Sequence, residues 1–380
     1  MRINKKIFFY AVLILMITSF IEVSSYLMGK YRENRVPVYK PIIQNKYLCE
    51  SYLKNHDPVL GWPAPINFGK NGDRDYSGSR IVPAFSNPIN SCISLYGDSF
   101  VWGADVSAKD MWGNILSKLT NCRVSNYGVP GYGTDQSYLR FHQNVKDNSS
   151  IVILGHLSEN ILRNLNQYRD ILDPVFGFNF KPRFVIDANG FLKLIPIPKF
   201  SVKELQEAVK NPKSYLKYEY FLRDSILDRI RFTFPYTISL VRWLIDRIPE
   251  KLANKPDWAK FYNPEDPSQA LLITTKIIES FHKEALLRSK IPVVIIIPTS
   301  YDLIYYQKNK EWVYQPLIDS LNDKGIFPLN IGMRIIDYIG NGDFSKLFIN
   351  RFGHFNKEGN KLFAEIVYSH LKGKNIFNKP

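Results

Sequence analysis

Short, mostly apolar runs alternate with helical segments along much of this chain, and few folds accommodate that alternation. We predict strands at Cys92–Tyr96, Cys122–Asn126 and Ile151–Gly155. A capping box at Ser107–Asp110 opens a helix after the first run, and Asp135–Gln143 is predicted to be a helix after the second. Apolar strands joined through helices form a mostly parallel sheet that helices cover on both faces. The sequence therefore predicts a three-layer α/β/α domain.

The alternation is interrupted over about residues 163–267. A hairpin is predicted at Arg183–Pro196, because Asn189-Gly190 separates two apolar stretches. The alternation then resumes with a helix, a strand and a final helix (Gln269–Arg288, Pro292–Ile297 and Lys357–Leu371). We therefore expect one domain over residues 91–372, with an insertion at 163–267 that caps or lines a site.

The N-terminus is predicted to be a membrane anchor. Ile7–Ile21 carries no charge, and the apolar character continues past Glu22 to Gly29. A stretch of this length can span a membrane. A cleaved signal peptide is the alternative, but Val23–Ser25 is only a fair cleavage site. We expect residues 1–29 to be an uncleaved single-pass signal-anchor, residues 30–90 a linker and loop-rich lead-in, and the domain to lie on the extracytoplasmic side.

The chain is basic, with 50 Lys+Arg against 35 Asp+Glu and a formal net charge of +15. Such a charge attracts an anionic polymer or lipid headgroups. The sequence has no CxxC motif and no Cys/His pairing at zinc-finger spacing, so we expect no nucleic acid partner, no metal and no cofactor. Cys92 and Cys122 each lie at the start of a predicted strand and could pair, leaving Cys49 unpaired; three free thiols is the alternative.

Residues that suit nucleophilic catalysis follow the predicted strands. Ser99 follows the first strand, Gly131 the second and Asn160 the third, and His354 precedes the last helix. The carboxyl ends of parallel strands converge on one edge of a sheet, where ligands bind. A nucleophilic serine needs a base, and the oxyanion that it forms needs hydrogen-bond donors. We predict Ser99 as nucleophile, His354 as base, and the Gly131 N–H and the Asn160 amide as oxyanion donors.

Four blocks around these residues resemble those of the SGNH (GDSL-like) hydrolases. The first contains Gly97-Asp98-Ser99, the second ends at Gly131, the third runs Gly155-His-Leu-Ser-Glu-Asn160, and the last contains Gly353-His354. The resemblance implies a flavodoxin-like α/β/α fold and a serine esterase without a cofactor. It also implies the roles of Ser99, Gly131, Asn160 and His354 given above.

One position departs from the family pattern. The family usually carries an aspartate three residues before the histidine, and Arg351 stands there in this chain. An acid orients the imidazole and stabilises its cationic form. Asp343 is the nearest upstream carboxylate and is the predicted partner of His354. Asp302 and a Ser–His dyad without an acid are the alternatives, and Asp98 is expected to be structural.

Resemblance to membrane-anchored members of the family implies an O-acyl ester of a cell-surface carbohydrate as substrate. An O-acyltransferase with the same site and a non-catalytic glycan-binding protein are the alternatives. The insertion carries aromatic side chains that would suit stacking on a sugar, although aromatic residues at such spacing also form cores. These residues are Trp243, Trp258, Phe261 and Tyr262.

Overall fold

We analysed a computed structural model of the chain. It describes residues 5–33, 45–63, 69, 72–87, 90–173, 179–221, 232–252, 254–340 and 342–374, without the side chains of residues 246–251. Parts of the lead-in predicted over residues 30–90, and a short part of the insertion, lie outside these ranges.

The central sheet has five strands, all parallel, in the order β2-β1-β3-β6-β7. The strands are β1 (Ser91–Tyr96), β2 (Arg123–Asn126), β3 (Ile151–Leu157), β6 (Ile291–Ile297) and β7 (Leu329–Asn330). Residues of β3 and β6 are buried almost throughout, as expected of strands covered on both faces. The predicted α/β fold with a parallel sheet is confirmed, and the strand order is that of flavodoxin-like folds.

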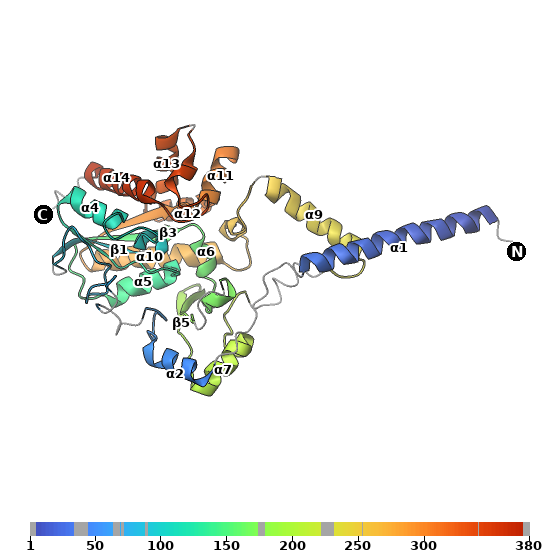
Figure 1. Cartoon of the computed structure of the whole chain (residues 1–380), viewed down its shortest axis with the longest axis horizontal. Coiled ribbons are helices and arrows are strands. Elements are labelled where there is room, and N and C mark those ends of the chain that lie inside the picture. The colour runs from blue at the N-terminus through green and yellow to red at the C-terminus, as the bar shows by residue number, and fades with distance from the viewer. Residues whose placement is uncertain are drawn as a thin grey trace.

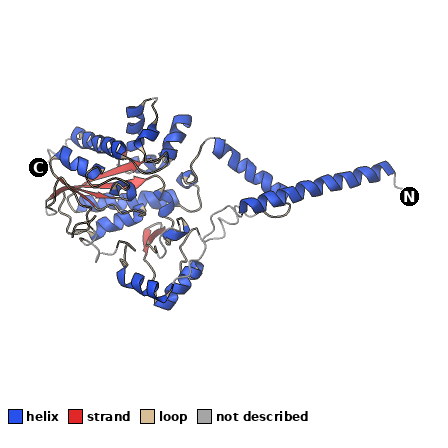
Figure 2. Cartoon of the chain, in the orientation of Figure 1, coloured by secondary structure: helices blue, strands red, loops and turns tan. Residues whose placement is uncertain are grey.

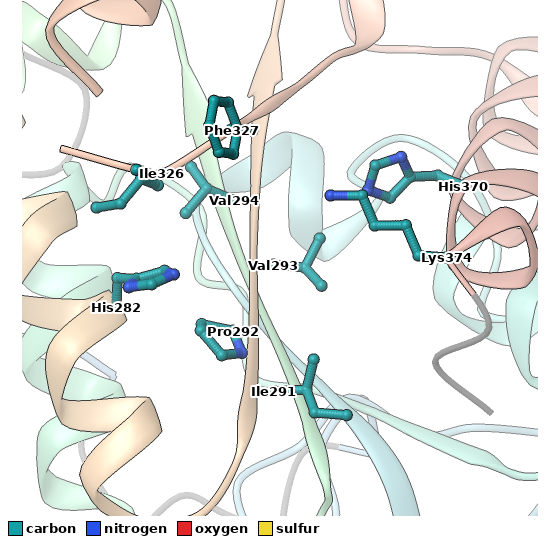
Figure 3. A pocket seen from close by; sticks show the side chains of 10 residues that line it. His282, Ile291, Pro292, Val293, Val294, Ile326, Phe327, His370 and Lys374 are labelled. Carbon is teal, nitrogen blue, oxygen red and sulfur yellow. The ribbon is translucent and has the colours of Figure 1, made fainter. Parts of the chain in front are cut away.

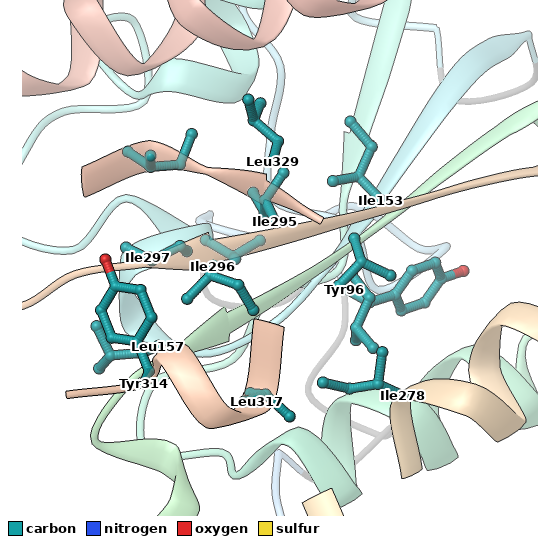
Figure 4. Close-up of a cluster of buried hydrophobic side chains, with 14 of the residues drawn as sticks. Tyr96, Ile153, Leu157, Ile278, Ile295, Ile296, Ile297, Tyr314, Leu317 and Leu329 are labelled. Atoms are coloured by element: carbon teal, nitrogen blue, oxygen red, sulfur yellow. The ribbon is translucent and has the colours of Figure 1, made fainter. Parts of the chain in front are cut away.

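Helices cover both faces of this sheet (Figure 1). On one face lie α4 (Trp112–Thr120), α13 (Ile331–Ile339) and α14 (Lys357–Gly373), and on the other α5 (Thr134–Gln143), α10 (Ala270–Leu287) and α12 (Gln315–Asn322). Figure 4 shows the side chains of β6 alternating between the two faces, with Ile296 near Leu317 of α12 and Ile295 near Leu329. The core therefore continues through the sheet.

Shorter elements complete the domain. At the carboxyl edge of the sheet they are α3 (Ser99–Trp102), α6 (Asn160–Arg163) and α11 (Ser300–Asn309). The 3-10 turns η4 (Ala259–Tyr262) and η5 (Phe344–Leu347) contact α6 and α11, respectively. The first three follow β1, β3 and β6, and they therefore surround the place where a ligand of such a sheet would bind.

The insertion forms a small second core with part of the lead-in. It contains the predicted hairpin, made of antiparallel β4 (Arg183–Ile186) and β5 (Leu192–Ile195), together with η2 (Arg169–Ile171), α7 (Val202–Lys210) and η3 (Pro212–Ser214). Helix α2 (Lys46–Asn55) packs against α7, so the lead-in is not loop throughout. Cys49 of α2 is buried there and is free.

The insertion is fastened to the domain by a buried ion pair. Lys181 Nζ lies 2.5 Å from Asp135 Oδ2 of α5, and both side chains are fully buried. The ammonium also donates to the backbone oxygens of Arg163, Asn166 and Pro182. The contact with Asp135 joins the insertion to α5, whereas the three bonds to backbone oxygens lie within the insertion and hold the Lys181 ammonium in place.

Cys92 and Cys122 form a disulfide at the amino ends of β1 and β2, with their Cα atoms 6.1 Å apart. Of the two alternatives drawn from the sequence, pairing is therefore the one that the structure contains.

One helix of the described residues is long and apolar enough to cross a membrane. It is α1 (Lys5–Glu33), which projects away from the domain (Figures 1 and 2). Helix α9 (Tyr236–Leu252), from the insertion, packs against the end of α1 that faces the domain. The apolar N-terminal helix is thus a candidate membrane anchor.

Candidate active site

The predicted nucleophile lies where β1 ends. The chain turns at Gly97-Asp98 and enters α3 with Ser99 as its first residue. A Cβ atom on Gly97 would collide with the Val101 side chain, so glycine allows α3 to pack directly over the strand ends. This close packing holds Ser99 at the carboxyl edge of the sheet, with its side chain reaching a pocket.

Ser99, His354 and a carboxylate form a chain of hydrogen bonds. Ser99 Oγ lies 2.8 Å from His354 Nε2, and His354 Nδ1 lies 2.6 Å from Asp105 Oδ2. Because the Asp105 carboxylate accepts a hydrogen bond from Nδ1–H, the neutral ring carries its proton on Nδ1 and presents Nε2 as an acceptor to the serine hydroxyl. Such an arrangement can remove the serine proton as the oxygen attacks a carbonyl carbon.

The prediction of Asp343 as the partner of His354 is corrected by this geometry. Asp343 accepts hydrogen bonds from the Ser345 backbone N–H (2.9 Å) and hydroxyl (2.6 Å), and it caps η5. The alternative, Asp302, is buried and accepts hydrogen bonds from Thr299 and Ser158. Nearness in sequence misled us, because the local turn already uses the Asp343 carboxylate.

Asp105 was missed because nothing near it in the sequence points to His354. It lies in the loop that follows α3 and has a φ of 63°, a left-handed conformation that aspartate tolerates better than most residues. Its partner is 249 residues away in the chain. The only feature of the sequence near Asp105 that could have identified it is its position six residues after Ser99. The short helix α3 between them keeps Asp105 near the end of β1.

Two backbone N–H groups at the pocket, those of Ser99 and Gly131, lack an acceptor among the described residues. Gly131 lines the pocket with Ser99 and has a φ of +84°, which favours glycine. Both N–H groups are therefore available to a developing oxyanion.

Asn160 lies beneath the pocket rather than in its wall. It is fully buried at the start of α6, and its amide nitrogen donates to Asp98 Oδ2 at 3.0 Å. Asp98 also accepts the Phe100 N–H at 2.9 Å and lies 3.4 Å from Arg163, as expected for a structural residue. Burial raises the pKa of Asp98, and Arg163 offsets part of that rise. The other amide hydrogen of Asn160 has no acceptor among the described residues.

The pocket above Ser99 has a volume of about 560 Å³. Two tryptophans line it: Trp62 comes from the lead-in, and its indole N–H donates to Pro130 O, whereas Trp102 ends α3. Three arginines line it as well (Arg74, Arg163 and Arg169), together with Asp73 and Asp173. The lead-in and the insertion thus supply walls to the pocket that Ser99 and His354 line.

The aromatic residues that we expected to stack on a sugar lie elsewhere. Trp258, Phe261 and Tyr262 are buried in the main core, and Trp243 lies against Arg32 of α1. Trp62 and Trp102 are the aromatic side chains of the pocket, and sequence analysis did not single them out.

A second, smaller pocket of about 210 Å³ lies at the amino end of β6 (Figure 3). His282 and His370 face it from opposite sides, and Phe327 and Lys374 complete its rim. No serine or cysteine lines it, in contrast to the pocket that Ser99 lines. Among the described residues, no group of three or more His, Cys, Asp or Glu side chains could hold a metal ion.

Comparison with known proteins places lipolytic enzymes among the structures most like this one. No protein-family model and no curated protein matches the sequence. A lipolytic G-D-S-L family member from Veillonella parvula is 14% identical (73% of this chain, 96% of that chain, TM-score 0.32). A lipase/acylhydrolase from Enterococcus faecalis is 12% identical (74% and 95%, TM-score 0.35), and a psychrotrophic esterase from a Pseudoalteromonas species is 10% identical (76% and 98%, TM-score 0.34).

Proposed function

We propose that this protein is a membrane-anchored serine hydrolase of the SGNH type that cleaves an O-acyl ester. The observation that carries the proposal is the Ser99–His354–Asp105 chain, with contacts of 2.8 and 2.6 Å, at the floor of a pocket. Three side chains from two distant segments of the chain, one with Ser99 and Asp105 and one with His354, meet at the strand edge where this fold binds ligands. A structural role would not require a serine hydroxyl directed at a histidine.

The geometry supports a two-step reaction. Ser99 Oγ attacks the acyl carbon while His354 Nε2 takes its proton, and Asp105 stabilises the imidazolium. The N–H groups of Ser99 and Gly131 and the Asn160 amide would donate to the oxyanion. When the intermediate collapses, the C–O bond breaks and the alcohol leaves with the proton from His354. Water then attacks the acyl-enzyme while His354 Nε2 takes its proton, and when the acyl C–Oγ bond breaks His354 returns that proton to Ser99 Oγ and the acid is released.

A carbohydrate ester is the substrate class that the pocket favours. Trp62 offers an aromatic face of the kind that packs against the C–H face of a sugar, whereas the ring of Trp102 is already covered by the guanidinium groups of Arg74 and Arg80 at 4.1 and 4.6 Å. The arginines and aspartates that line the pocket offer partners for the hydroxyls of a sugar. The volume of about 560 Å³ exceeds what a small acyl group alone would fill. We therefore infer that the pocket holds an acyl group and at least part of the glycan that bears it.

An extracytoplasmic location is part of the proposal. Disulfides persist in oxidising compartments, and Cys92 and Cys122 are paired. If the short basic N-terminus stays in the cytoplasm, α1 would carry the domain across the membrane. The domain would then meet cell-surface glycans directly.

The proposal is tested by labelling the full chain with a serine-reactive fluorophosphonate in detergent or in membranes. We expect one adduct, on Ser99, which disappears in Ser99→Ala and His354→Ala. Ser107→Ala is the matched control, because Ser107 lies in the nearby loop and bonds to Asp110 instead of a histidine. The control should label normally. Folded protein that forms no adduct would refute the hydrolase proposal and favour a non-catalytic glycan-binding role.

Hydrolysis and transfer are then separated with an acetylated oligosaccharide and an unmodified acceptor oligosaccharide. Free acetate as the product would support the esterase. Acetyl groups on the acceptor, dependent on Ser99, would instead assign an O-acyltransferase.

A further inference from the structure

Helix α9 begins against the half of α1 that is nearer the domain and then diverges from it toward the domain (Figure 1). The first residues of α9, Tyr236 and Thr237, contact Glu22 and Tyr26 of α1, and Trp243 contacts Arg32. Both helices therefore run in the same direction, away from the apolar N-terminal part of α1. Helix α9 then leads back into the catalytic domain, so the insertion reaches the candidate anchor.

Glu22 caps the start of α9. Its carboxylate accepts hydrogen bonds from the backbone N–H groups of Tyr236 and Thr237, the latter at 3.0 Å, and from the Thr237 hydroxyl. The first N–H groups of a helix lack partners within the helix, and the helix dipole favours a negative charge there. This contact gives the single acidic residue inside the apolar run a partner.

Further contacts make the two helices fit closely. Ser25 and Thr237 share a hydrogen bond of 3.2 Å, and the rings of Tyr26 and Tyr236 meet edge to face with centroids 4.9 Å apart. A Cβ atom on Gly29 would lie 2.7 Å from the Phe232 ring, so glycine permits this approach. The contact is thus built from complementary residues on both helices.

The opposite face of α9 is apolar and exposed. Ile238, Val241 and Ile245 are exposed by 51%, 46% and 64%, and Phe234, just before the helix, is exposed by 74%. Spacings of three and four residues place the first three on one stripe of a helix. This stripe continues the exposed apolar surface of α1, whose side chains such as Phe20 are equally uncovered.

Helix geometry gives the depth of this contact if α1 spans a bilayer. From Ile7 to Tyr26 the helix rises about 29 Å, which matches a hydrocarbon core of about 30 Å. Tyr26 and Tyr31, with Lys30 and Arg32, then mark the outer interface, where aromatic and basic residues are favoured. Glu22 lies about 6 Å inside that level, and so does the first turn of α9.

We propose that α9 is a second membrane-inserted segment, whose first turns lie in the leaflet nearer the domain with lipid acyl chains covering Phe234, Ile238 and Val241. Arg242 lies about 8 Å beyond Thr237, which brings it to the level of Tyr26, where its guanidinium reaches headgroups. The inference rests on the proposed anchoring by α1. Its consequence is that the catalytic domain is attached at two points, which limits how its pocket can turn relative to the membrane.

The test measures the depth of single environment-sensitive NBD labels on the full chain in phosphatidylcholine/phosphatidylglycerol vesicles. Cysteines replace Phe20, Ile238, Ile245 or Tyr76 in a Cys49→Ala background, with the disulfide intact. Nitroxide on the lipid acyl chains should quench Ile238 about as strongly as Phe20, and Ile245 less. Aqueous iodide should quench Tyr76, which is 87% exposed on the domain, about fivefold more than Ile238.

The outcomes distinguish failure of the proposed insertion of α9 from failure of the proposed anchoring by α1. A lipid-quenched Phe20 with an iodide-quenched Ile238 overturns the insertion of α9 and leaves the anchor standing. An iodide-quenched Phe20 overturns the anchor itself. An Ile238 label shielded from both quenchers means that a protein partner covers the stripe, which also overturns lipid contact.

The capping contact gives an independent readout. Glu22→Ala removes the partner of two backbone N–H groups, so the Ile238 label should become several-fold more accessible to iodide. Thr18→Ala is the matched control, because Thr18 lies one turn earlier on α1 and bonds only to the backbone of its own helix. An unchanged depth of the Ile238 label in Glu22→Ala would overturn the inference that Glu22 holds the start of α9 in the membrane.

Discussion

Replacing Asp105 with asparagine tests whether this carboxylate supports His354. Asparagine keeps the size of the side chain and tolerates the left-handed backbone of this residue, whose φ is 63°. The substitution therefore removes the charge that faces His354 Nδ1 at 2.6 Å and leaves the loop in place.

The expected loss follows from the exposure of the pair. Two unit charges 4 Å apart attract by about 1 kcal/mol in water and about 4 kcal/mol at a protein surface with a dielectric constant of about 20. The side chains of His354 and Asp105 are 29% and 56% exposed, so the environment lies between these limits. A transition-state loss of about 2 to 3 kcal/mol slows the reaction about 30- to 150-fold. A fully buried acid costs more, about 10⁴-fold in the chymotrypsin-type triad.

The assay is the steady-state hydrolysis of p-nitrophenyl acetate by the detergent-solubilised full chain, with the rate of fluorophosphonate labelling as a second readout. We expect kcat and the labelling rate to fall together while KM stays within about twofold, because Asp105 acts only after substrate is bound. If Asp105 had only a structural role, the substitution would lower the midpoint of thermal unfolding without lowering kcat selectively at a nearly constant KM.

Two controls make the result specific to Asp105. Asp110→Asn removes a carboxylate of the same loop that pairs with Lys357 at 3.4 Å, and Asp343→Asn removes the residue favoured by the sequence. Both should keep nearly full activity. If Asp105→Asn keeps its rate within about threefold, or if Asp343→Asn loses more, the assignment of Asp105 is wrong.

Three further predictions follow from the same structure. Asn160→Ala should lower kcat by about 10² with the fold retained, as loss of one oxyanion donor does, and an unchanged rate would remove Asn160 from the site. Lys181→Met should destabilise the protein by about 3 to 5 kcal/mol, because it leaves Asp135 buried and unpaired, whereas the double change Lys181→Met/Asp135→Leu should recover much of that loss in thermal unfolding. Burial lowers the pKa of His156 to about 3 from 6.5, so its contribution to stability is complete above pH 6.5 and is lost as the pH falls towards 3. The difference in free energy of unfolding between wild type and His156→Gln should therefore fall by about 1.4 kcal/mol per pH unit below pH 6.5. A difference that does not change with pH would show that the pKa of His156 is not lowered by burial.

Ser99 and His354, the proposed nucleophile and base, were accessible to sequence reasoning because each lies in a local pattern. An apolar strand ending in Gly97-Asp98-Ser99 requires a turn that exposes the serine at the sheet edge. Gly131 follows the next strand in the same way, and parallel strands bring their carboxyl ends together whatever lies between them. The parallel sheet, the hairpin of the insertion and the apolar N-terminal helix follow from periodicity and turn residues over a few positions.

The tertiary structure decided which residues complete the site. Asp105 pairs with His354 across 249 residues, Trp62 reaches the pocket from the lead-in, and Glu22 meets α9 across 214 residues. A carboxylate can cap a helix, pair with a base or orient a histidine, and an indole can pack in a core or line a pocket. The residues next to it in the sequence do not determine which of these it does. Local patterns depend on backbone preferences over a few residues, whereas these contacts depend on how distant segments pack, and the packing of the whole chain therefore selected Asp105 over Asp343 as the partner of His354.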